Sequence, residues 1–339
     1  MRTDDFDYEL PAAFIAQHPA QPRDSSRLLV LDRRAEAIRH ARFRDLPSIL
    51  APGDLLVLNE TRVIPARLHA RKVPGGGRVE LLLLRRIAPQ RWEAMVGGRG
   101  LRAGTRLQIE RGPEATIESV QGSLRVVRFK QSISAVLGEA GETPLPPYIT
   151  APLRSPDEYQ TVFARTDGSA AAPTAGLHFT PELLRSLGEA GIRTATVTLH
   201  VGLDTFAPVK VSDPREHPIH REWCRLDEEA VAAIRLTRES GRRIVAVGTT
   251  SVRTLETAAR GAAPGEVALP FEGWTGLLIL PGHAFGAVDA MITNFHLPRS
   301  TLLMLVSAFA GRERILKAYQ TAMAEGYRFY SFGDAMLIL

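Results

Sequence analysis

The segment 289–311 brings polar residues to the start of an apolar helix. Its sequence, DAMITNFHLPRSTLLMLVSAFAG, places Asn294 and His296 shortly before Ser300, a suitable N-cap for a helix over 301–311. The apolar run is shorter than the roughly 20 residues that cross a bilayer, so it predicts a buried helix. The free N–H groups and the positive dipole end of such a helix bind anions, and an adjacent histidine can transfer protons.

A second polar cluster lies at 248–256, where the sequence GTTSVRTLE follows an apolar strand and begins a helix. Thr249, Thr250 and Ser251 supply hydroxyl and N–H donors, and Arg253 lies in the first helical turn. Strand–turn–helix segments of this kind often hold a ligand carboxylate or phosphate. A well-capped turn without a ligand would have the same sequence, so the cluster indicates a binding site only together with its neighbours.

Three further titratable residues are candidates for proton transfer. His178 directly precedes a helix capped by Thr180, and His200 ends an apolar strand, with Asp204 four residues further on. Histidine at the carboxyl end of a strand often belongs to an active site in α/β proteins, although a structural histidine is the commoner case. Asp289 lies among apolar residues and is therefore either paired or functional, and we favour a functional role.

The sequence argues against a metal or cofactor site. His217, His220 and Glu222 in HPIHREW could each ligate a metal, but their spacing matches no common metal motif. We therefore expect these residues to contact substrate or solvent. The single cysteine, Cys224, excludes internal disulfides, cysteine-rich zinc sites and iron–sulfur clusters. Sequence motifs of P-loop, Rossmann, α/β-hydrolase and HExxH enzymes are also absent.

Two patterns of secondary structure along the chain predict an α/β main domain with an inserted small all-β domain. Short strands separated by turns indicate a barrel or sandwich, with strands at 78–84, 91–96, 105–109, 115–120 and 124–129. Elsewhere we expect strands at 28–31, 54–59, 194–201, 243–247 and 276–280 and helices at 181–191, 228–241 and 252–260. The expected boundaries are 1–66 and 149–339 for the main domain and 67–148 for the inserted barrel-like domain.

The composition is that of a globular protein and permits a nucleic-acid partner. The net charge is +5, and only four of the 42 basic residues are lysines. Arginine pairs bidentately with phosphate and stacks on bases, as a nucleic-acid partner would require. A GC-rich genome also favours arginine over lysine, so the charge alone does not establish RNA binding. The N-terminal sequence MRTDDFDYEL lacks an apolar signal region, which predicts a cytoplasmic protein without membrane attachment.

Eight longer strings are similar to one enzyme family. They are RDSSRLLVLDR (23–33), LLVLNETRVIPARL (55–68), PLPPYI (144–149), YQTVFA (159–164), AAPTAGLHFT (171–180), TLHVGLDTFAPV (198–209), VGTTSVRTLE (247–256) and DAMITNFHLPRSTLLMLVSAFAG (289–311). On these strings the chain resembles, over essentially its whole length, the S-adenosylmethionine:tRNA ribosyltransferase-isomerases of queuosine biosynthesis. It departs from the family pattern at His283, where the family has tyrosine, and at GGRGLRAG (97–104), which lacks the usual proline and lysine.

The resemblance implies a reaction that uses no metal, flavin or cluster. The ribosyl group of S-adenosylmethionine is transferred and rearranged onto 7-aminomethyl-7-deazaguanine at the wobble position of tRNA. The products are epoxyqueuosine in tRNA, adenine and methionine. S-adenosylmethionine is thus a co-substrate, no cofactor is bound permanently, and we expect a monomer whose partners are tRNA and S-adenosylmethionine. The implied fold is an α/β domain with an inserted small β-barrel.

The chemistry of this reaction can be assigned to the candidate residues as a hypothesis. Proton transfer would involve a pool made of His178, His200, Asp289 and His296, whose order the sequence leaves open. Substrate binding would involve Thr249, Thr250, Ser251 and Asn294, with Arg253 holding the methionine carboxylate. Tyr148 and Arg67 would contact the anticodon loop by stacking and phosphate pairing.

Two other functions stay open on the sequence alone. An S-adenosylmethionine-dependent tRNA methyltransferase would need a glycine-rich turn after its first strand, and neither 28–32 nor 55–60 is followed by such a turn. A non-catalytic RNA-binding protein would use the barrel as its platform. The expected barrel has few aromatic residues that could stack on bases, chiefly Trp92 and Phe129.

Overall fold

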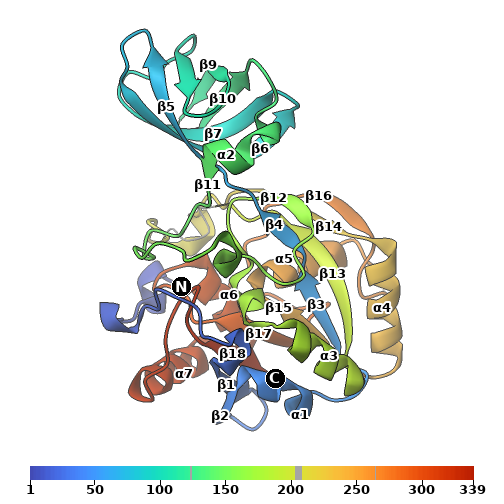
Figure 1. Cartoon of the computed structure of the whole chain (residues 1–339). Coiled ribbons are helices and arrows are strands. Elements are labelled where there is room, and N and C mark those ends of the chain that lie inside the picture. Colours follow the sequence, from blue (N-terminus) through green and yellow to red (C-terminus); the bar gives the residue numbers. More distant parts are fainter. Residues whose placement is uncertain (123, 203–207, 264) are drawn as a thin grey trace. The chain divides into compact units, whose positions relative to one another are not determined.

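The chain folds into two compact units. The computed structural model describes residues 1–122, 124–202, 208–263 and 265–339. The larger unit contains residues 1–61, 147–166 and 172–339, and the smaller contains 62–146 and 167–171. Both ends of the chain therefore belong to the larger unit (Figure 1). The fold class is the one expected, an α/β unit with an inserted β-barrel.

A nine-stranded mixed sheet forms the centre of the larger unit, in the order β16-β14-β13-β3-β15-β17-β18-β1-β2. Strands β13, β3, β15 and β17 run parallel, whereas β18 is antiparallel to β17 and parallel to β1. The strands are β1 (Arg27–Asp32), β2 (Ala37–Arg42), β3 (Leu55–Asn59), β13 (Arg193–Leu199), β14 (Glu222–Leu226), β15 (Ile244–Val247), β16 (Phe271–Thr275), β17 (Ala290–Asn294) and β18 (Ala335–Ile338).

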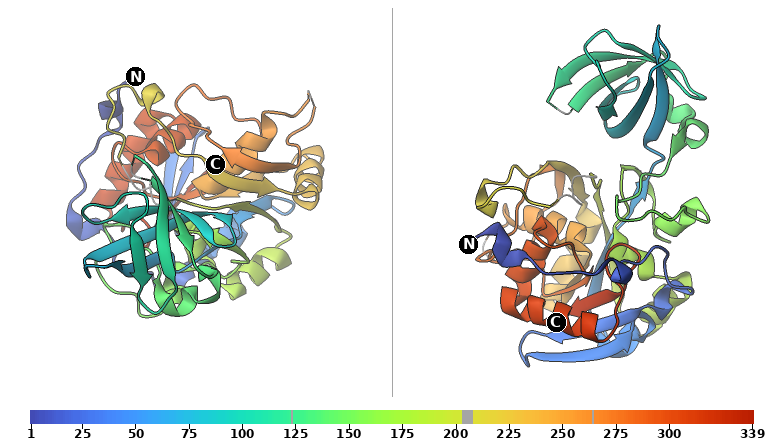
Figure 2. Two further views of the ribbon diagram at one scale, coloured as in Figure 1. Left: turned by 90° about the horizontal axis from the view of Figure 1, so that it is seen from above. Right: turned by 90° about the vertical axis from the view of Figure 1, so that its left-hand side faces the viewer.

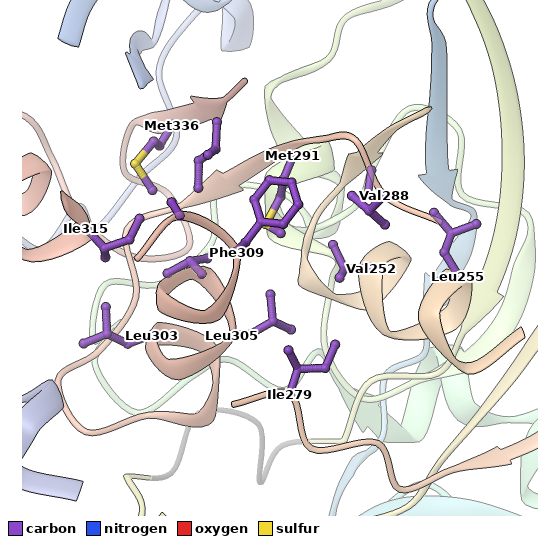
Figure 3. Packing of buried hydrophobic residues seen from close by; sticks show 14 of the residues in the cluster. Val252, Leu255, Ile279, Val288, Met291, Leu303, Leu305, Phe309, Ile315 and Met336 are labelled. Atoms are coloured by element: carbon purple, nitrogen blue, oxygen red, sulfur yellow. The ribbon is translucent and has the colours of Figure 1, made fainter. Parts of the chain in front are cut away.

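Successive residues of the central strands pack into two different hydrophobic clusters, because side chains alternate between the faces of a sheet. In β3, Leu55 and Val57 join the cluster that contains residues of α4 to α7, whereas Leu56 and Leu58 join the one with residues of α1 and α3. Figure 3 shows part of the first cluster around Phe309. The helices are α1 (Leu46–Ile49), α3 (Pro181–Glu189), α4 (Glu228–Glu239), α5 (Thr249–Ala259), α6 (Thr301–Ala310) and α7 (Arg312–Ala324).

The smaller unit contains a closed six-stranded antiparallel barrel, in the order β5-β6-β7-β10-β9-β8, with β8 pairing back to β5. Apolar residues of alternate positions, such as Val79, Leu81 and Leu83, fill its interior. Its elements are β5 (Arg67–Val73), β6 (Arg78–Ala88), β7 (Arg91–Gly97), β8 (Arg106–Ile109), β9 (Glu114–Gln121), β10 (Leu124–Phe129), α2 (Leu137–Ala140) and β11 (Gly141–Glu142). A separate two-stranded sheet consists of β4 (Thr61–Val63) and β12 (Thr166–Ser169).

Most elements lie where the sequence predicts them, with three informative differences. Helix α5 begins at Thr249, three residues before the expected start. The expected strand at 276–280 is wrong, because the last strand of this region is β16, which ends at Thr275. The carbonyl of Leu277 instead accepts a hydrogen bond from Nε of Arg253, at 3.1 Å. Helix α7 and strand β18 were not predicted.

Helices α6 and α7 follow each other directly and pack side by side (Figure 2). Ser300 caps α6 as expected, since its Oγ accepts from the N–H of Leu303 at 3.1 Å. Within the described ranges, no helix has the length and apolar character needed to span a membrane.

Candidate active site

The carboxyl ends of β13, β15 and β17 open onto a cleft that contains about 510 Å³ of empty space, counting the part open to solvent. In α/β sheets, ligands bind at this edge. We call it the carboxyl-edge cleft. Its lining consists of Tyr148, Ala172, Pro173, Thr174, Ala175, Val201, Gly248, Thr249, Thr250, Thr293, Asn294, Phe295, His296, Leu297, Leu302, Tyr330 and Ser331.

The N-terminus of α5 supplies donors to this cleft. Gly248, the N-cap, has a φ of +85°, a conformation that favours glycine, and it provides no side-chain cap for the helix. Within the described part of the chain, the Oγ1 of the buried Thr250 has no hydrogen-bond partner. Ser251 is turned away, because its Oγ donates to the carbonyl of Val247 at 2.8 Å. Of the three hydroxyl residues predicted here, Thr249 and Thr250 therefore line the cleft.

His296 also lines the cleft and is held from several sides. Its Nε2 is hydrogen-bonded with Oγ1 of Thr293 at 2.7 Å, and its backbone N–H donates to the hydroxyl of Tyr319 at 2.9 Å. Burial lowers the pKa of His296 to about 3, so the ring is neutral at neutral pH. Because a hydroxyl can donate or accept, the pair with Thr293 allows either neutral tautomer, and Nδ1 can accept or donate a proton.

His178 lies behind the cleft rather than in its lining. Its Nε2 accepts from Nδ2 of Asn294 at 3.2 Å, so the neutral ring carries its proton on Nδ1 and donates to Oγ of Ser26 at 2.8 Å. Burial, with a smaller contribution from Arg328, lowers the pKa of His178 to about 3. The Oδ1 of Asn294 accepts from the hydroxyl of Thr174 at 2.8 Å. His178 thus orients two residues of the cleft.

The glycine that follows Ala175 allows the backbone before His178 to approach its neighbours closely. A Cβ at Gly176 would lie 2.8 Å from the ring of Phe163 and 2.9 Å from Cγ2 of Thr161. Gly176 belongs to the short 3₁₀ segment η7 (Thr174–His178), which carries Thr174 into the cleft and His178 behind it. The backbone at Gly176 therefore lies closer to Phe163 and Thr161 than a residue with a Cβ would allow.

Another wall of the cleft is aromatic and joins Tyr148, which was predicted to contact substrate, with Tyr330, which was not. Tyr330 lies 4.7 Å from Tyr148, ring centre to ring centre, and the hydroxyl of Tyr148 is hydrogen-bonded with Oγ of Ser331 at 2.8 Å. Burial raises the pKa of Tyr330 to about 12, so its phenol stays protonated. Tyr330 has a φ of +68°, which is unusual for a residue other than glycine. No motif in the sequence marks this segment, and only the fold reveals it.

Arg253 does not reach the carboxyl-edge cleft. It lines a second pocket, which we call the arginine pocket, together with Gly202, His217, Ile219, His220, Glu222, Leu277, Leu278, Ile279, Thr301, Leu302 and Leu305. Nη1 of Arg253 donates to Oε2 of Glu222, and both side chains are buried. Thr249 and Thr250 thus line one pocket, Arg253 lines the other and Ser251 lines neither, although the two linings share Leu302.

The remaining candidates are not in either lining. Asp289 precedes β17, at the opposite end of the strand from Asn294, and accepts from Nη1 of Arg238 and from the N–H of Ile244, each at 2.8 Å. Of the two alternatives for Asp289, the structure shows the paired one, so we correct our preference for a functional carboxylate. Nδ1 of His200 is hydrogen-bonded with Thr61 at 2.8 Å, next to Val201 of the cleft. Asp204 falls outside the described residues.

Other residues singled out from the sequence have structural partners. Arg67 belongs to β5 of the smaller unit, where Nε lies 3.5 Å from Oε1 of Glu80. His283 is hydrogen-bonded through Nε2 with Oε2 of Glu256 at 3.3 Å. Among the residues that the structure describes, no group of three or more histidine, cysteine or acidic side chains is placed to hold a metal ion.

Comparison with known proteins assigns the chain to a family. Residues 3–338 match the model of a family described as queuosine biosynthesis protein. The chain belongs to this family. Among its relatives, the S-adenosylmethionine:tRNA ribosyltransferase-isomerase of Moorella thermoacetica is 54% identical over 345 residues, covering the whole of both chains. That of Thermotoga maritima is 50% identical over 343 residues, again covering both chains fully.

A solved structure from the same family gives the same result. The crystal structure of S-adenosylmethionine tRNA ribosyltransferase from Thermotoga maritima, at 2.00 Å resolution, matches with a TM-score of 0.58 and 42% sequence identity. The match covers 99% of this chain and 100% of that one. Family membership thus extends over both units and includes every residue of the carboxyl-edge cleft and the arginine pocket.

Proposed function

We propose that this protein is an S-adenosylmethionine:tRNA ribosyltransferase-isomerase. It transfers and isomerises the ribosyl group of S-adenosylmethionine onto 7-aminomethyl-7-deazaguanine at the tRNA wobble position, releasing adenine and methionine. The observation that carries the proposal is the 54% identity over the full length of a relative with this name. A cleft lined by polar and aromatic side chains at the carboxyl edge of the parallel strands supports it.

The carboxyl-edge cleft is our proposed place for the adenosyl group. Tyr148 and Tyr330 offer aromatic surface on which the adenine ring can stack. The N-terminus of α5 and the hydroxyl of Thr250 offer donors to the sugar oxygens, on which negative charge develops as the ring rearranges. Because the three groups lie in one lining, a single nucleoside can contact all of them.

His296 is our proposed proton-transfer group. The sulfonium acidifies the neighbouring carbon of the ribose, from which a base must remove a proton, and adenine must receive a proton as it leaves. His296 lines the cleft with a neutral ring, and its hydrogen bond with Thr293 accommodates either tautomer. Asn294 and Thr174, held by His178, position the substrate beside it. His200, next to the cleft, is a second candidate for proton transfer.

tRNA is the proposed acceptor, and its amine attacks the rearranged sugar before methionine leaves. We propose that Arg67, on β5, pairs with a phosphate of the anticodon loop. Its side chain is about one third exposed and lies 3.5 Å from Glu80, so a phosphate would have to share or replace that ion pair.

Adenine release tests the proposal directly. The purified protein is incubated with S-adenosylmethionine and tRNA carrying the aminomethyl-deazaguanine, and adenine and methionine are quantified. We expect both products in equal amounts and only when that tRNA is present. Formation of S-adenosylhomocysteine would instead indicate methyl transfer, and binding of tRNA without any product would favour a non-catalytic RNA-binding protein.

Variants of the cleft test the assignment of His296. His296→Gln keeps a polar side chain but cannot shuttle a proton, so adenine release should fall by about 100-fold or more. Asp289→Asn is the matched control. Asp289 and His296 both lie next to β17, but Asp289 is at the end of the strand that is away from the cleft. If both variants release adenine at the same rate as the unmodified protein, the role of His296 is refuted.

A further inference from the structure

The arginine pocket contains a buried cation that the fold satisfies only in part. Arg253 is 6% exposed, and its Nη2 is buried without a hydrogen-bond partner among the residues that the structure describes. A buried guanidinium nitrogen without a partner is unfavourable, and native proteins rarely leave one unexplained. Burial lowers the pKa of Arg253 to about 10, so the group is still protonated at neutral pH. An anionic ligand oxygen would supply the missing partner.

The rest of the guanidinium is fixed in place. Nε donates to the carbonyl of Leu277 at 3.1 Å, and Nη1 donates to Oε2 of Glu222. Oε1 of Glu222 accepts from the N–H of Gly202 at 2.9 Å. These contacts fix the plane of the guanidinium and the carboxylate beside it, and both residues belong to the pocket lining. Such preorganisation lowers the entropy lost on binding.

The charge pattern selects one class of ligand. A phosphate or another multiply charged anion would be repelled by the carboxylate of Glu222, which also lines the pocket. An α-amino acid carries a carboxylate and an ammonium on one carbon, which matches an arginine and a glutamate side by side. We propose that the arginine pocket binds the amino-acid end of S-adenosylmethionine, with its carboxylate on Arg253 and its ammonium on Glu222. This inference rests on the proposed function, because it names the subsite for one part of that substrate.

The position of the pocket fits this occupant. Leu302 lines both the arginine pocket and the carboxyl-edge cleft, and the adjacent residues Val201 and Gly202 line the cleft and the pocket respectively. One ligand can therefore extend from one to the other past Leu302. The apolar side chains of Leu277, Ile279 and Leu305 provide a suitable wall for the methylene groups of the methionyl chain.

Three ligands separate the two subsites on the unmodified protein. Calorimetry is done in the presence of tRNA with unmodified guanine at the wobble position, so that binding is measured without turnover. S-adenosylmethionine should bind about 10- to 100-fold more tightly than its decarboxylated form, which lacks the carboxylate that Arg253 recognises. 5′-Methylthioadenosine, which lacks the whole amino-acid end, should bind only in the carboxyl-edge cleft. Equal affinity for S-adenosylmethionine and its decarboxylated form would overturn the proposal.

Variants of both residues give an independent test. Arg253→Gln and Glu222→Gln should each lower the affinity for S-adenosylmethionine by about tenfold or more. The affinity for 5′-methylthioadenosine should change by no more than about twofold. Arg225→Gln and Glu272→Gln are the matched controls, because they remove the same charges from exposed positions of β14 and β16. Arg253→Lys is a further variant for the case in which a neutral variant does not fold. It keeps the positive charge and should retain part of the affinity for S-adenosylmethionine. A parallel loss for both ligands would show that the pair is only structural.

The binding measurements and the adenine assay can fail independently of each other. If the unmodified protein releases adenine but does not discriminate against decarboxylated S-adenosylmethionine, the subsite is wrong and the function stands. If it binds S-adenosylmethionine in the predicted way but releases no adenine with the modified tRNA, the function is wrong and the subsite stands.

Discussion

Acidification should destabilise the larger unit through its two buried histidines. His178 and His296 are buried, and burial lowers the pKa of each from 6.5 to about 3. In the unfolded chain both regain ordinary values near 6.5. Between pH 6.5 and pH 3 the unfolded state therefore binds more protons than the folded state. The contribution of the two neutral histidines to the free energy of unfolding is therefore complete above pH 6.5. It is lost progressively as the pH falls toward 3.

The size of this effect follows from the two pKa values. Each proton taken up only on unfolding changes the free energy of unfolding by about 1.4 kcal/mol per pH unit. Between pH 7 and pH 5, each histidine should therefore contribute a loss of about 2 kcal/mol, and the two together about 4 kcal/mol. Because domains are commonly stable by about 5–15 kcal/mol, this loss would be readily measurable.

Urea unfolding at pH 7, 6 and 5 measures the loss. The protein has three tryptophans, and Trp92 lies in the barrel, so a Trp92→Phe background restricts the fluorescence signal to Trp223 and Trp274 of the larger unit. In that background, His178→Gln should reduce the pH-dependent loss by about half, since one of the two protons is no longer taken up. An unchanged pH slope in His178→Gln would refute the conclusion that His178 is buried in its neutral form.

Three further predictions concern single residues of the larger unit. Asp289→Asn should keep its turnover, measured by adenine release. Urea unfolding should show a loss of about 1–2 kcal/mol of stability, because the hydrogen bonds with Arg238 and Ile244 are weakened. Gly248→Ala should lose about 1–2 kcal/mol, because alanine is strained at a φ of +85°, and it should raise the KM for S-adenosylmethionine. Asn294→Leu should lower kcat by about 10- to 100-fold with a normal thermal midpoint, and unchanged kcat would contradict its role.

Much of the fold could be predicted from the sequence where local signals agree. Thr180 and Asp227 both cap helices as expected, because each side chain accepts from the N–H three residues on. The strands of the barrel are bounded by turns and alternate in burial, which is a local property of the chain. In contrast, 276–280 has the alternating burial of a strand but pairs with no strand among the described residues. Sequence alone cannot show whether a pairing partner exists.

The candidate site was predictable in its residue types but not in its grouping. Thr249, Thr250, Asn294 and His296 share one lining because their strands are parallel, a relation that follows from the order of strands in the sheet. Arg253 lies only three residues after Thr250 yet faces another pocket, since residues three apart on a helix differ in direction by about 60°.

The wall formed by Tyr330 and Ser331 was missed for a related reason. These residues follow α7 and precede β18, neither of which was predicted, so nothing indicated that the chain returns to the cleft. Asp289 shows the opposite error, in which an acid within an apolar stretch suggested function. Its actual partner, Arg238, lies on α4, 51 residues earlier in the chain.

The place of β18 in the sheet has a consequence for how the chain folds during synthesis. β18 comes after every other strand in the sequence, yet it lies between β17 and β1 and joins them. Until the ribosome has released residues 335–338, β1 and β2 have no edge of the main sheet to pair with. The barrel, made largely of the continuous residues 62–146, can form much earlier. The nascent protein should therefore acquire its inserted unit first, and the larger unit should close only when its final strand arrives.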